Sequence, residues 1–449
     1  MCTPSRRLLS RTFNFTWAAA VAAVFALAGT ASADEVFKAT KAITLPDGQN
    51  IVSFDISFVD PVLKLYILGD RTNKAVDVVD TDNNKVVAQV GKGLFTGATG
   101  NNDTSGPDGV MFVDQKEIWA GDGDSTLKIF SWPAGTLIKS LSTGGAKRVD
   151  EMCFDPVDHL AMAANNADDP PFVTIISSTT HSIVPNGKII FDGSTTVHGT
   201  TPVASNGIEQ CQWNPRTGKF YISVPEISGP NNPNLTNSVA GGVTVIDPKT
   251  LIIEKTFVID HAACAGPQGM AVGPDNQILL GCNAPSGTNG TPGNTGNGNF
   301  STVVINDAAS AFTAINNESG ADEVWFNPGD NHYFLARSSA AGPAAGGHQQ
   351  LGVIDAVSLQ VDQSIPTVRS AAAPLNAHSV AADPNRNQVY VPIPGANAAN
   401  PNGAGTVCSS VSVPGHKGSD TQGCIAIFTT HNDDRPSVAR ERQPDEHQE

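Results

Sequence analysis

The sequence predicts an all-β fold, a seven-bladed β-propeller closed by an N-terminal strand. One block recurs along the chain: a short apolar strand, a tight turn and a second apolar strand. Repetition of such a block indicates an array in which each unit adds its own slice of core. Most of the turns contain Asp-Pro, Asn-Pro or Gly-Pro, where proline presets φ for the turn. The seven blocks are FDISFVDPVLKLYIL, PDGVMFVDQKEIWAG, VDEMCFDPVDHLAMA, IEQCQWNPRTGKFYIS, PQGMAVGPDNQILLG, DEVWFNPGDNHYFLA and HSVAADPNRNQVYVP.

Each block is followed by a third strand, such as KAVDVVDT or GGVTVIDP, and usually by a fourth, such as LIIEKTFV. Four strands in ~40–60 residues are typical of a propeller blade. The last block has a third strand at 424–428 and then runs into a charged tail, so it has no fourth strand of its own. We expect Phe37–Leu45 to supply that strand and to remove the open edge of the last blade.

The ends of the chain are predicted to lie outside the propeller, which spans residues 34–431. Residues 1–33 read as a signal peptide, with arginines at the start, an apolar stretch and Ala31-Ser32-Ala33 as the cleavage site. Arg6 and Arg7 also suit a twin-arginine signal, and the choice between the two export routes stays open. Residues 432–449 are charged and are predicted to be a disordered tail. The predicted location is therefore periplasmic or secreted.

The net charge of the chain narrows the class of partner that it is expected to bind. The formal net charge is −16, and loss of the three arginines within residues 1–33 makes it −19. This charge argues against nucleic acid and against anionic membrane surfaces. Beyond the signal, no apolar run approaches the ~18 residues that span a bilayer. We expect a monomer that binds a small polar molecule or a partner protein.

The cysteines indicate disulfides. Seven cysteines become six when Cys2 leaves with the signal, and an even number suits an oxidising compartment. Cys264–Cys282 and Cys408–Cys424 are the predicted pairs. Cys153 and Cys211 are either a third pair or two buried thiols.

The segment LYILGDRTNKAVDVVDTDNNKVV (65–87) resembles the repeat of YVTN-type propeller proteins, and 220–223, 243–251 and 388–392 match that repeat again. The resemblance extends over most of the mature chain and implies a propeller. It implies no particular chemistry, because that family is functionally mixed.

The candidate site is a ring of polar residues at one end of the central channel. Inner strands line the channel of a propeller, so the residues that open them should converge. Glu151 and Glu323 lie one position further in and either extend the ring or point away. The seven residues that open the inner strands are Asp55, Asp108, Asp150, Glu209, Gln268, Asp322 and His378.

Carboxylates and an amide suit a hard divalent cation, with Ca²⁺ expected first, and the histidine moves the preference toward Mn²⁺ or Zn²⁺. The electrostatics agree, because like charges ~4 Å apart repel by roughly 4 kcal/mol at an effective dielectric near 20. Two alternatives stay open. The ring residues either cap strand starts and solvate a wet channel, or act in acid–base chemistry without a metal.

The long loops, rich in Gly, Asn, Pro and Ser, are predicted to lie on the same face as the ring. Loops of this kind around a polar hole indicate a ligand pocket. The main functional hypothesis is a cation-dependent binding module for a small molecule. The alternatives are a protein-interaction scaffold and a metal-dependent lactone or ester hydrolase. The carboxylates and amide of the ring also resemble the metal site of gluconolactonase-type propellers, which implies a metal-dependent hydrolase. In that case His378, which those sites lack, or Asp150 would activate water.

Overall fold

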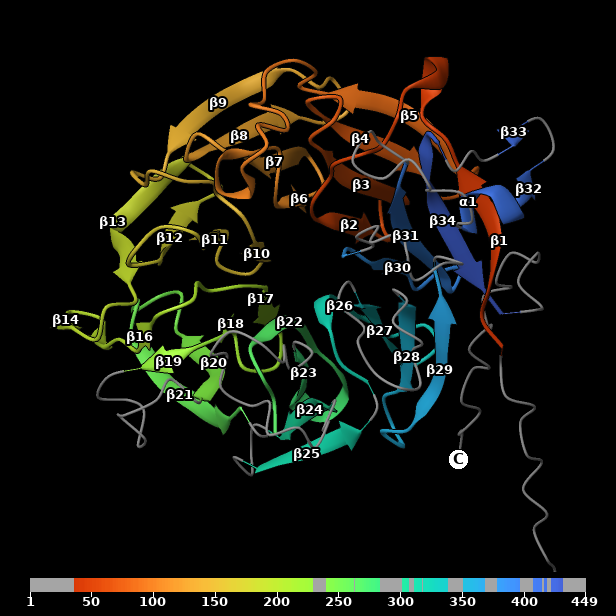
Figure 1. Cartoon of the computed structure of the whole chain (residues 1–449). Helices are drawn as coiled ribbons and strands as arrows, with labels where there is room; N and C mark the ends of the chain where they lie inside the picture. The colour runs from red at the N-terminus through yellow and green to blue at the C-terminus, as the bar shows by residue number, and fades with distance from the viewer. Residues whose placement is uncertain are drawn as a thin grey trace, which may run out of the picture. The chain divides into compact units, whose positions relative to one another are not determined.

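A computed structural model gives the fold (Figure 1). The structure describes residues 36–228, 240–261, 263–282, 301–306, 311–316, 318–337, 350–367, 378–395, 407–413, 416–417 and 421–430. The predicted signal peptide (1–33) and tail (432–449) lie outside these ranges, as do large parts of the predicted long loops at 225–240, 283–299, 338–349 and 393–423.

The described chain forms seven four-stranded antiparallel sheets, and these are the blades of a β-propeller. The predicted fold class is therefore confirmed. The first three blades comprise β2 (Ser57–Asp60), β3 (Leu65–Asp70), β4 (Ala75–Asp80) and β5 (Lys85–Val90); β6 (Val110–Val113), β7 (Glu117–Gly121), β8 (Thr126–Ser131) and β9 (Leu137–Ser142); and β10 (Met152–Asp155), β11 (Leu160–Asn165), β12 (Phe172–Ser177) and β13 (Ser182–Ile190).

The next three blades follow the same order from the channel outward. They comprise β17 (Cys211–Asn214), β18 (Lys219–Val224), β20 (Ala240–Ile246) and β21 (Ile253–Asp260); β22 (Pro267–Val272), β23 (Gln277–Cys282), β24 (Ser301–Asn306) and β25 (Ala311–Asn316); and β26 (Ala321–Asn327), β27 (His332–Arg337), β28 (Gln350–Asp355) and β29 (Val361–Pro366).

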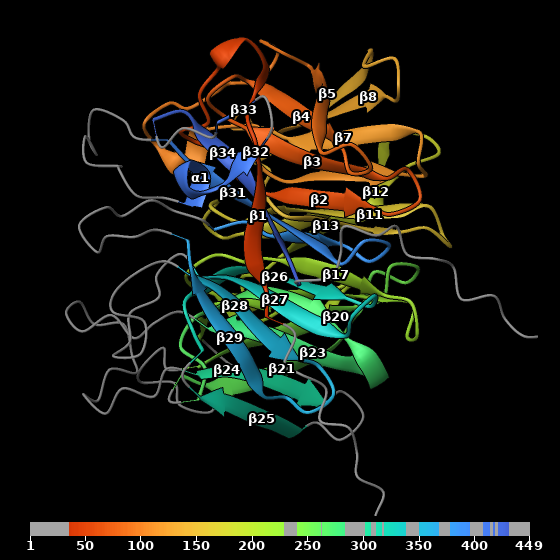
Figure 2. The ribbon, with the colours of Figure 1, turned by 90° about the vertical axis from the view of Figure 1, so that its right-hand side faces the viewer.

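The seventh blade joins the two ends of the propeller. Its strands are β30 (Ala381–Asp383), β31 (Gln388–Pro394), β34 (Gly423–Thr429) and, at the outer edge, β1 (Lys38–Ile43). β1 pairs antiparallel with β34, with Ala42 opposite Ala426 (Figure 2). This confirms that the segment 37–45 completes the last blade. It also covers an edge of β34 that would otherwise present unpaired backbone groups.

Short helices and short pairs of strands lie in the loops. They are η1 (Pro46–Gly48), η2 (Asn102–Thr104), η4 (Pro274–Asn276) and α1 (Val407–Ser410), with the short strand pairs β14 (Thr195–Thr196) and β15 (Gly199–Thr200), β16 (Val203–Ala204) and β19 (Ile227–Ser228), and β32 (Ser412–Val413) and β33 (His416–Lys417). Among the described residues, no helix has the length and apolar character needed to cross a membrane.

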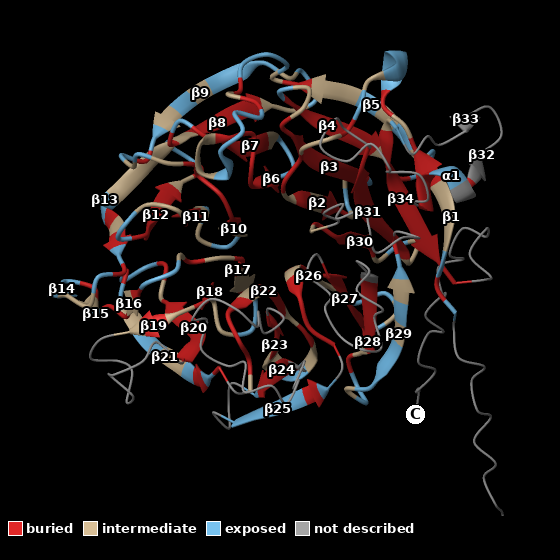
Figure 3. Ribbon diagram, in the orientation of Figure 1, coloured by how far each residue is buried: buried red, intermediate tan, exposed pale blue. Residues whose placement is uncertain are grey.

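The inner strands contact one another around the channel, in the order β2, β6, β10, β17, β22, β26, β30 and back to β2. The hydrophobic core lies between successive blades, so the middle strands are buried on both faces. In β31 every residue is buried, whereas β29 on the outer edge is mostly exposed (Figure 3). Buried middle strands and half-exposed outer strands are what face-to-face sheet packing requires.

Three disulfides are present, Cys153–Cys211, Cys264–Cys282 and Cys408–Cys424. The last two confirm the predicted pairs, and the first settles the question that the sequence left open. Cys153–Cys211 joins the inner strands β10 and β17 of neighbouring blades. Three disulfides fit an extracellular or periplasmic location.

Candidate functional site

Ring residues occupy equivalent backbone positions at the starts of the inner strands. Their backbone N–H groups donate to carbonyls near the ends of the second strands: Asp55 to Gly69 at 2.9 Å, Asp108 to Gly121 at 3.0 Å, Asp150 to Ala164 at 2.8 Å and Glu209 to Ser223 at 3.0 Å. Blades approach closely here, because a Cβ added to Gly109 would lie 1.8 Å from the carbonyl oxygen of Asp150. The repeat thus directs side chains from separate blades toward the same end of the channel.

Arg71 is the first cation within the ring. It follows β3 and reaches the first two ring carboxylates. Its Nε donates to Asp108 Oδ1 at 2.7 Å, and its Nη2 forms ion pairs with Asp55 and Asp108. Its Nη1 donates to Asn102 Oδ1 at 2.6 Å. A guanidinium with its donors filled in this way is rigidly held.

Arg148 is the second cation, and it precedes β10. Its Nη2 lies 2.6 Å from Asp150 Oδ2, and its Nη1 lies 3.8 Å from Asp55 Oδ2. Its Nε donates to Asn166 Oδ1 at 3.2 Å. We call the set Asp55, Asp108, Asp150, Arg71 and Arg148 the arginine-bound arc; its five side chains are all buried.

His378 adjoins this arc from the seventh blade. Its Nε2 lies 3.1 Å from Asp55 Oδ1, and its Nδ1 lies 3.9 Å from Asp322 Oδ2. Burial alone would lower the pKa of His378, but Asp55 and Asp322 raise it above its ordinary value. The two carboxylates therefore favour the protonated form of the imidazole, against the effect of burial.

The remaining ring residues, Glu209, Gln268 and Asp322, form the open arc. They open the inner strands of three consecutive blades, and each is more exposed than the arginine-bound carboxylates. The Asp322 side chain is 34% exposed, against 0% for that of Asp108. Among the described residues, no arginine or lysine forms an ion pair with Glu209 or Asp322. Glu209 accepts one long hydrogen bond, from Asn166 Nδ2 at 3.5 Å.

Asp55 of the arginine-bound arc and the carboxylates of the open arc differ in their protonation equilibria, whereas burial raises the pKa values of Asp108 and Asp150 as well. Burial alone would raise the pKa of Asp55, but Arg71, His378 and Arg148 outweigh burial and hold that pKa well below its usual range. Burial raises the pKa of Glu209 well above its ordinary value, and the charges of Asp150 and Asp322 add to the shift. Burial likewise raises the pKa of Asp322.

These contacts show which sequence-predicted site residues come together. Ion pairs link five of them, directly or through the arginines: Asp55, Asp108, Asp150, Asp322 and His378. Glu209 lies close enough to Asp150 and Asp322 for their charges to raise its pKa. The side chain of Gln268 makes no hydrogen bond with the described residues. In the arginine-bound arc, two guanidinium groups supply the positive charge that the sequence argument had assigned to a metal.

Sequence reasoning missed both arginines. Arg148 stands two residues before Asp150, so its place beside the ring was readable from the sequence. Arg71 follows the second strand of its blade, and its contact with Asp108 crosses to the next blade. A contact of that kind depends on blade packing, which the repeat pattern does not specify.

A separate acidic group stands away from the ring. In the described part of the chain, one set of three His, Asp or Glu side chains brings its ligating atoms within 4.8 Å of one another: His332, Asp355 and Asp362. His332 Nε2 lies 2.9 Å from Asp362. Although burial opposes the shift, Asp330 and Asp362 raise the pKa of His332 to about 9. This group is therefore an ion-pair cluster at neutral pH.

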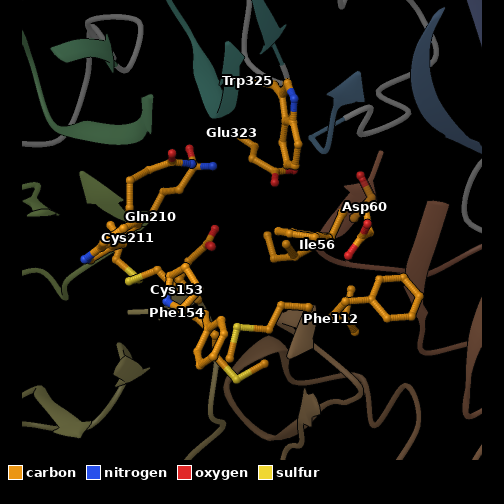
Figure 4. A pocket seen from close by; sticks show the side chains of 18 of the residues that line it. Ile56, Asp60, Phe112, Cys153, Phe154, Gln210, Cys211, Glu323 and Trp325 are labelled. Atoms are coloured by element: carbon orange, nitrogen blue, oxygen red, sulfur yellow. A yellow bond between two sulfur atoms is a disulfide. The ribbon is translucent and has the colours of Figure 1, made fainter. Parts of the chain in front are cut away.

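The channel contains a cavity of about 460 Å³ next to the ring. Its walls come from the inner strands, and it extends to residues of the short turns, such as Asp60, Gln115 and Pro156. Glu151, Gln210 and Glu323, each one position beyond a ring residue, line it as well. Figure 4 shows Gln210, Glu323 and Ile56 around this space.

Comparison with known proteins supports the fold. No model of a known protein family matches the chain, and no curated protein matches it. A chain in the structure of Kuenenia stuttgartiensis hydrazine synthase is 12% identical with a TM-score of 0.56, covering 78% of this chain and 93% of that one. A chain in a crystal structure of the mitotic checkpoint complex is 13% identical with a TM-score of 0.54, covering 86% and 96%. At such identities the likeness shows the fold alone.

Proposed function

We propose that this chain is an exported binding protein that holds a small polar ligand at the long-loop face, with a divalent cation on the open arc. The observation that carries the proposal is the division of the ring. Asp55, Asp108 and Asp150 have arginine partners. Among the described residues, Glu209 forms no ion pair and Asp322 has only the distant contact with His378 at 3.9 Å, and both are more accessible than the arginine-bound carboxylates.

The open arc has the donor chemistry of a hard-cation site. Two carboxylates and the amide oxygen of Gln268 are oxygen ligands of the kind that Ca²⁺ accepts, with water completing its coordination. Ca²⁺ remains the first candidate. Mn²⁺ and Zn²⁺ are less favoured than the sequence suggested, because His378 is engaged with Asp55 and tends to be protonated.

Space for a polar ligand lies beside Glu209. A cavity of about 370 Å³ is lined by Arg148, Asn166, Asp168, Ser205 and Glu209 among others. Its lining offers an edge of the Arg148 guanidinium, carboxylates and amide or hydroxyl groups. A ligand of mixed polarity could therefore bridge the cation and Arg148.

Binding is favoured over the hydrolase alternative. Burial raises the pKa of Asp150 to about 7 against the effect of Arg148, a value that would suit acid–base chemistry. However, Asp150 is buried and its carboxylate contacts Arg148, and His378 Nε2 contacts Asp55, so neither is free to activate water.

Calorimetry with Ca²⁺ and Mn²⁺ alone tests the proposal. We expect the wild type to bind Ca²⁺, and Glu209→Gln and Asp322→Asn each to weaken binding by about tenfold or more, because each removes a charged ligand. Asp155→Asn is the matched control, since Asp155 accepts from the N–H groups of Val157 and Asp158 in a turn at the other end of the channel. Binding of neither ion to the wild type, or equal affinities in all variants, would refute the cation site and favour an interaction scaffold.

A further inference from the structure

The channel cavity has features of a second, separate ligand site. It lies among the inner strands of five blades and reaches the short-turn end, away from the long loops. Its volume of about 460 Å³ is in the range of small-molecule pockets. The residues that line it are described throughout, and none belongs to the open arc.

Glu151 is a buried carboxylate without a partner at the inner part of this cavity. It is 5% exposed and accepts no hydrogen bond from any described residue. Its neighbours are already engaged. Gln210 donates to the carbonyl of Val324 at 3.1 Å and accepts from the N–H of Met270 at 2.6 Å, and Glu323 accepts from the N–H of Val380 at 3.0 Å. Glu151 thus has hydrogen-bonding capacity that no described residue uses.

The walls are aromatic and sulfur-rich. Phe58 and Trp325 meet edge to face with ring centroids 5.5 Å apart, and both line the cavity. Met111, Met152 and Phe154 line it too. Trp213 and Trp325 pack against core clusters and also line the cavity. Aromatic faces and polarizable sulfur stabilise an organic cation that has lost its water.

We propose that this cavity binds an organic ammonium ion, with the ammonium group at Glu151 and Glu323 and the apolar body against the aromatic and methionine side chains. A neutral apolar molecule would leave Glu151 without a partner, and an anion would meet two acidic side chains. A hydrated metal ion would gain little from the apolar walls. An amine with an aryl or alkyl body satisfies both parts of the lining.

Binding should be linked to proton release. Burial raises the pKa of Glu151 well above its ordinary value, and the charge of Glu323 adds to the shift. A bound ammonium ion favours the ionised carboxylate, so affinity should rise with pH over the range in which Glu151 ionises. The charged groups that act on Glu151 are Glu323, Asp150, Asp55 and Glu209.

Calorimetry with three isosteric probes tests the inference: 2-phenylethylammonium, 2-phenylethanol and 3-phenylpropionate. We expect the ammonium ion to bind the wild type at least about tenfold more tightly than the alcohol, and the carboxylate to bind most weakly. Equal affinity for amine and alcohol would show an apolar cavity without a cation site and would overturn the proposal, as would failure of the amine to bind.

Glu151→Gln should lower the affinity for the amine about tenfold or more and leave that for the alcohol unchanged. The matched control is Glu254→Gln, which removes an exposed carboxylate paired with Lys219 on an outer strand. If Glu151→Gln does not fold, the comparison of the three probes on the wild type decides alone.

Discussion

Asp55 of the arginine-bound arc and Glu209 of the open arc begin from the same position in the blade repeat but reach opposite protonation equilibria. Asp55 and Glu209 both open inner strands and pair with the second strand in the same way. Burial favours a raised pKa at both positions. At Asp55 burial is outweighed by Arg71, His378 and Arg148, and the pKa falls. At Glu209 the charges of Asp150 and Asp322 add to burial, and the pKa rises. A repeat therefore fixes where a side chain lies, whereas residues from neighbouring blades decide whether its charge is compensated.

Of the changes that test this comparison, removal of Arg148 should lower the free energy of unfolding most. Arg148→Met would leave Asp150 buried without its ion-pair partner, and loss of one member of a buried pair costs about 3–5 kcal/mol. Urea unfolding of the full chain measures the change. Lys147→Met is the control, because Lys147 pairs with Asp103 at the surface and should contribute little to stability. Equal, small losses in both variants would show that the arc does not need its arginine.

The disulfide Cys153–Cys211 joins the blade that supplies Asp150 to the blade that supplies Glu209, so it fixes the border between the arcs. Replacement of both cysteines by serine should lower the free energy of unfolding by about 2–4 kcal/mol, because the unfolded chain regains a loop. Cys264–Cys282 closes a shorter segment, with a sequence separation of 18 against 58, and its removal should cost about 1 kcal/mol less in the chain-entropy model. If removal of Cys264–Cys282 cost more than removal of Cys153–Cys211, the link between the arcs would contribute little to stability.

The fold was predictable from the sequence because the same hairpin pattern recurs in every blade. Seven hairpins with turn signals predicted seven sheets, and the missing last strand predicted the role of 37–45, which β1 confirms. The placement of Asp55, Asp108, Asp150 and Glu209 followed from the same repeat, since equivalent strand starts converge at a channel.

The partners of these residues were not predictable in the same way. Arg71 belongs to a turn of the first blade and contacts Asp108 of the second, so its role depends on how the blades pack. The channel cavity was missed for a related reason. Glu151 was recognised as lying next to the ring, but whether it pointed into the channel depended on the local backbone, and the strand pattern left both directions open.

The pH dependence of stability should show the smallest effect, and its sign distinguishes Asp55 from Glu209. The pKa of Asp55 lies well below its ordinary value of 3.8 in the folded chain, so its ionised form stabilises the fold above that pH. Asp55→Asn should therefore cost about 1–2 kcal/mol at pH 7, and the loss should shrink as the pH falls below about 4.

Glu209 should behave in the opposite way. Its pKa is raised well above 4.5 in the folded chain, so the fold holds a proton that the unfolded chain releases, and stability declines as the pH rises from 4.5 through the folded value. Glu209→Gln should then be more stable than the wild type at pH 8 by about 1 kcal/mol or less, given its partial exposure, with no difference near pH 4. Chemical denaturation of both variants from pH 3.5 to 8, without divalent cations, measures the two curves. If both variants lose stability at pH 8, Glu209 has a cationic partner and the open arc is compensated like its neighbour.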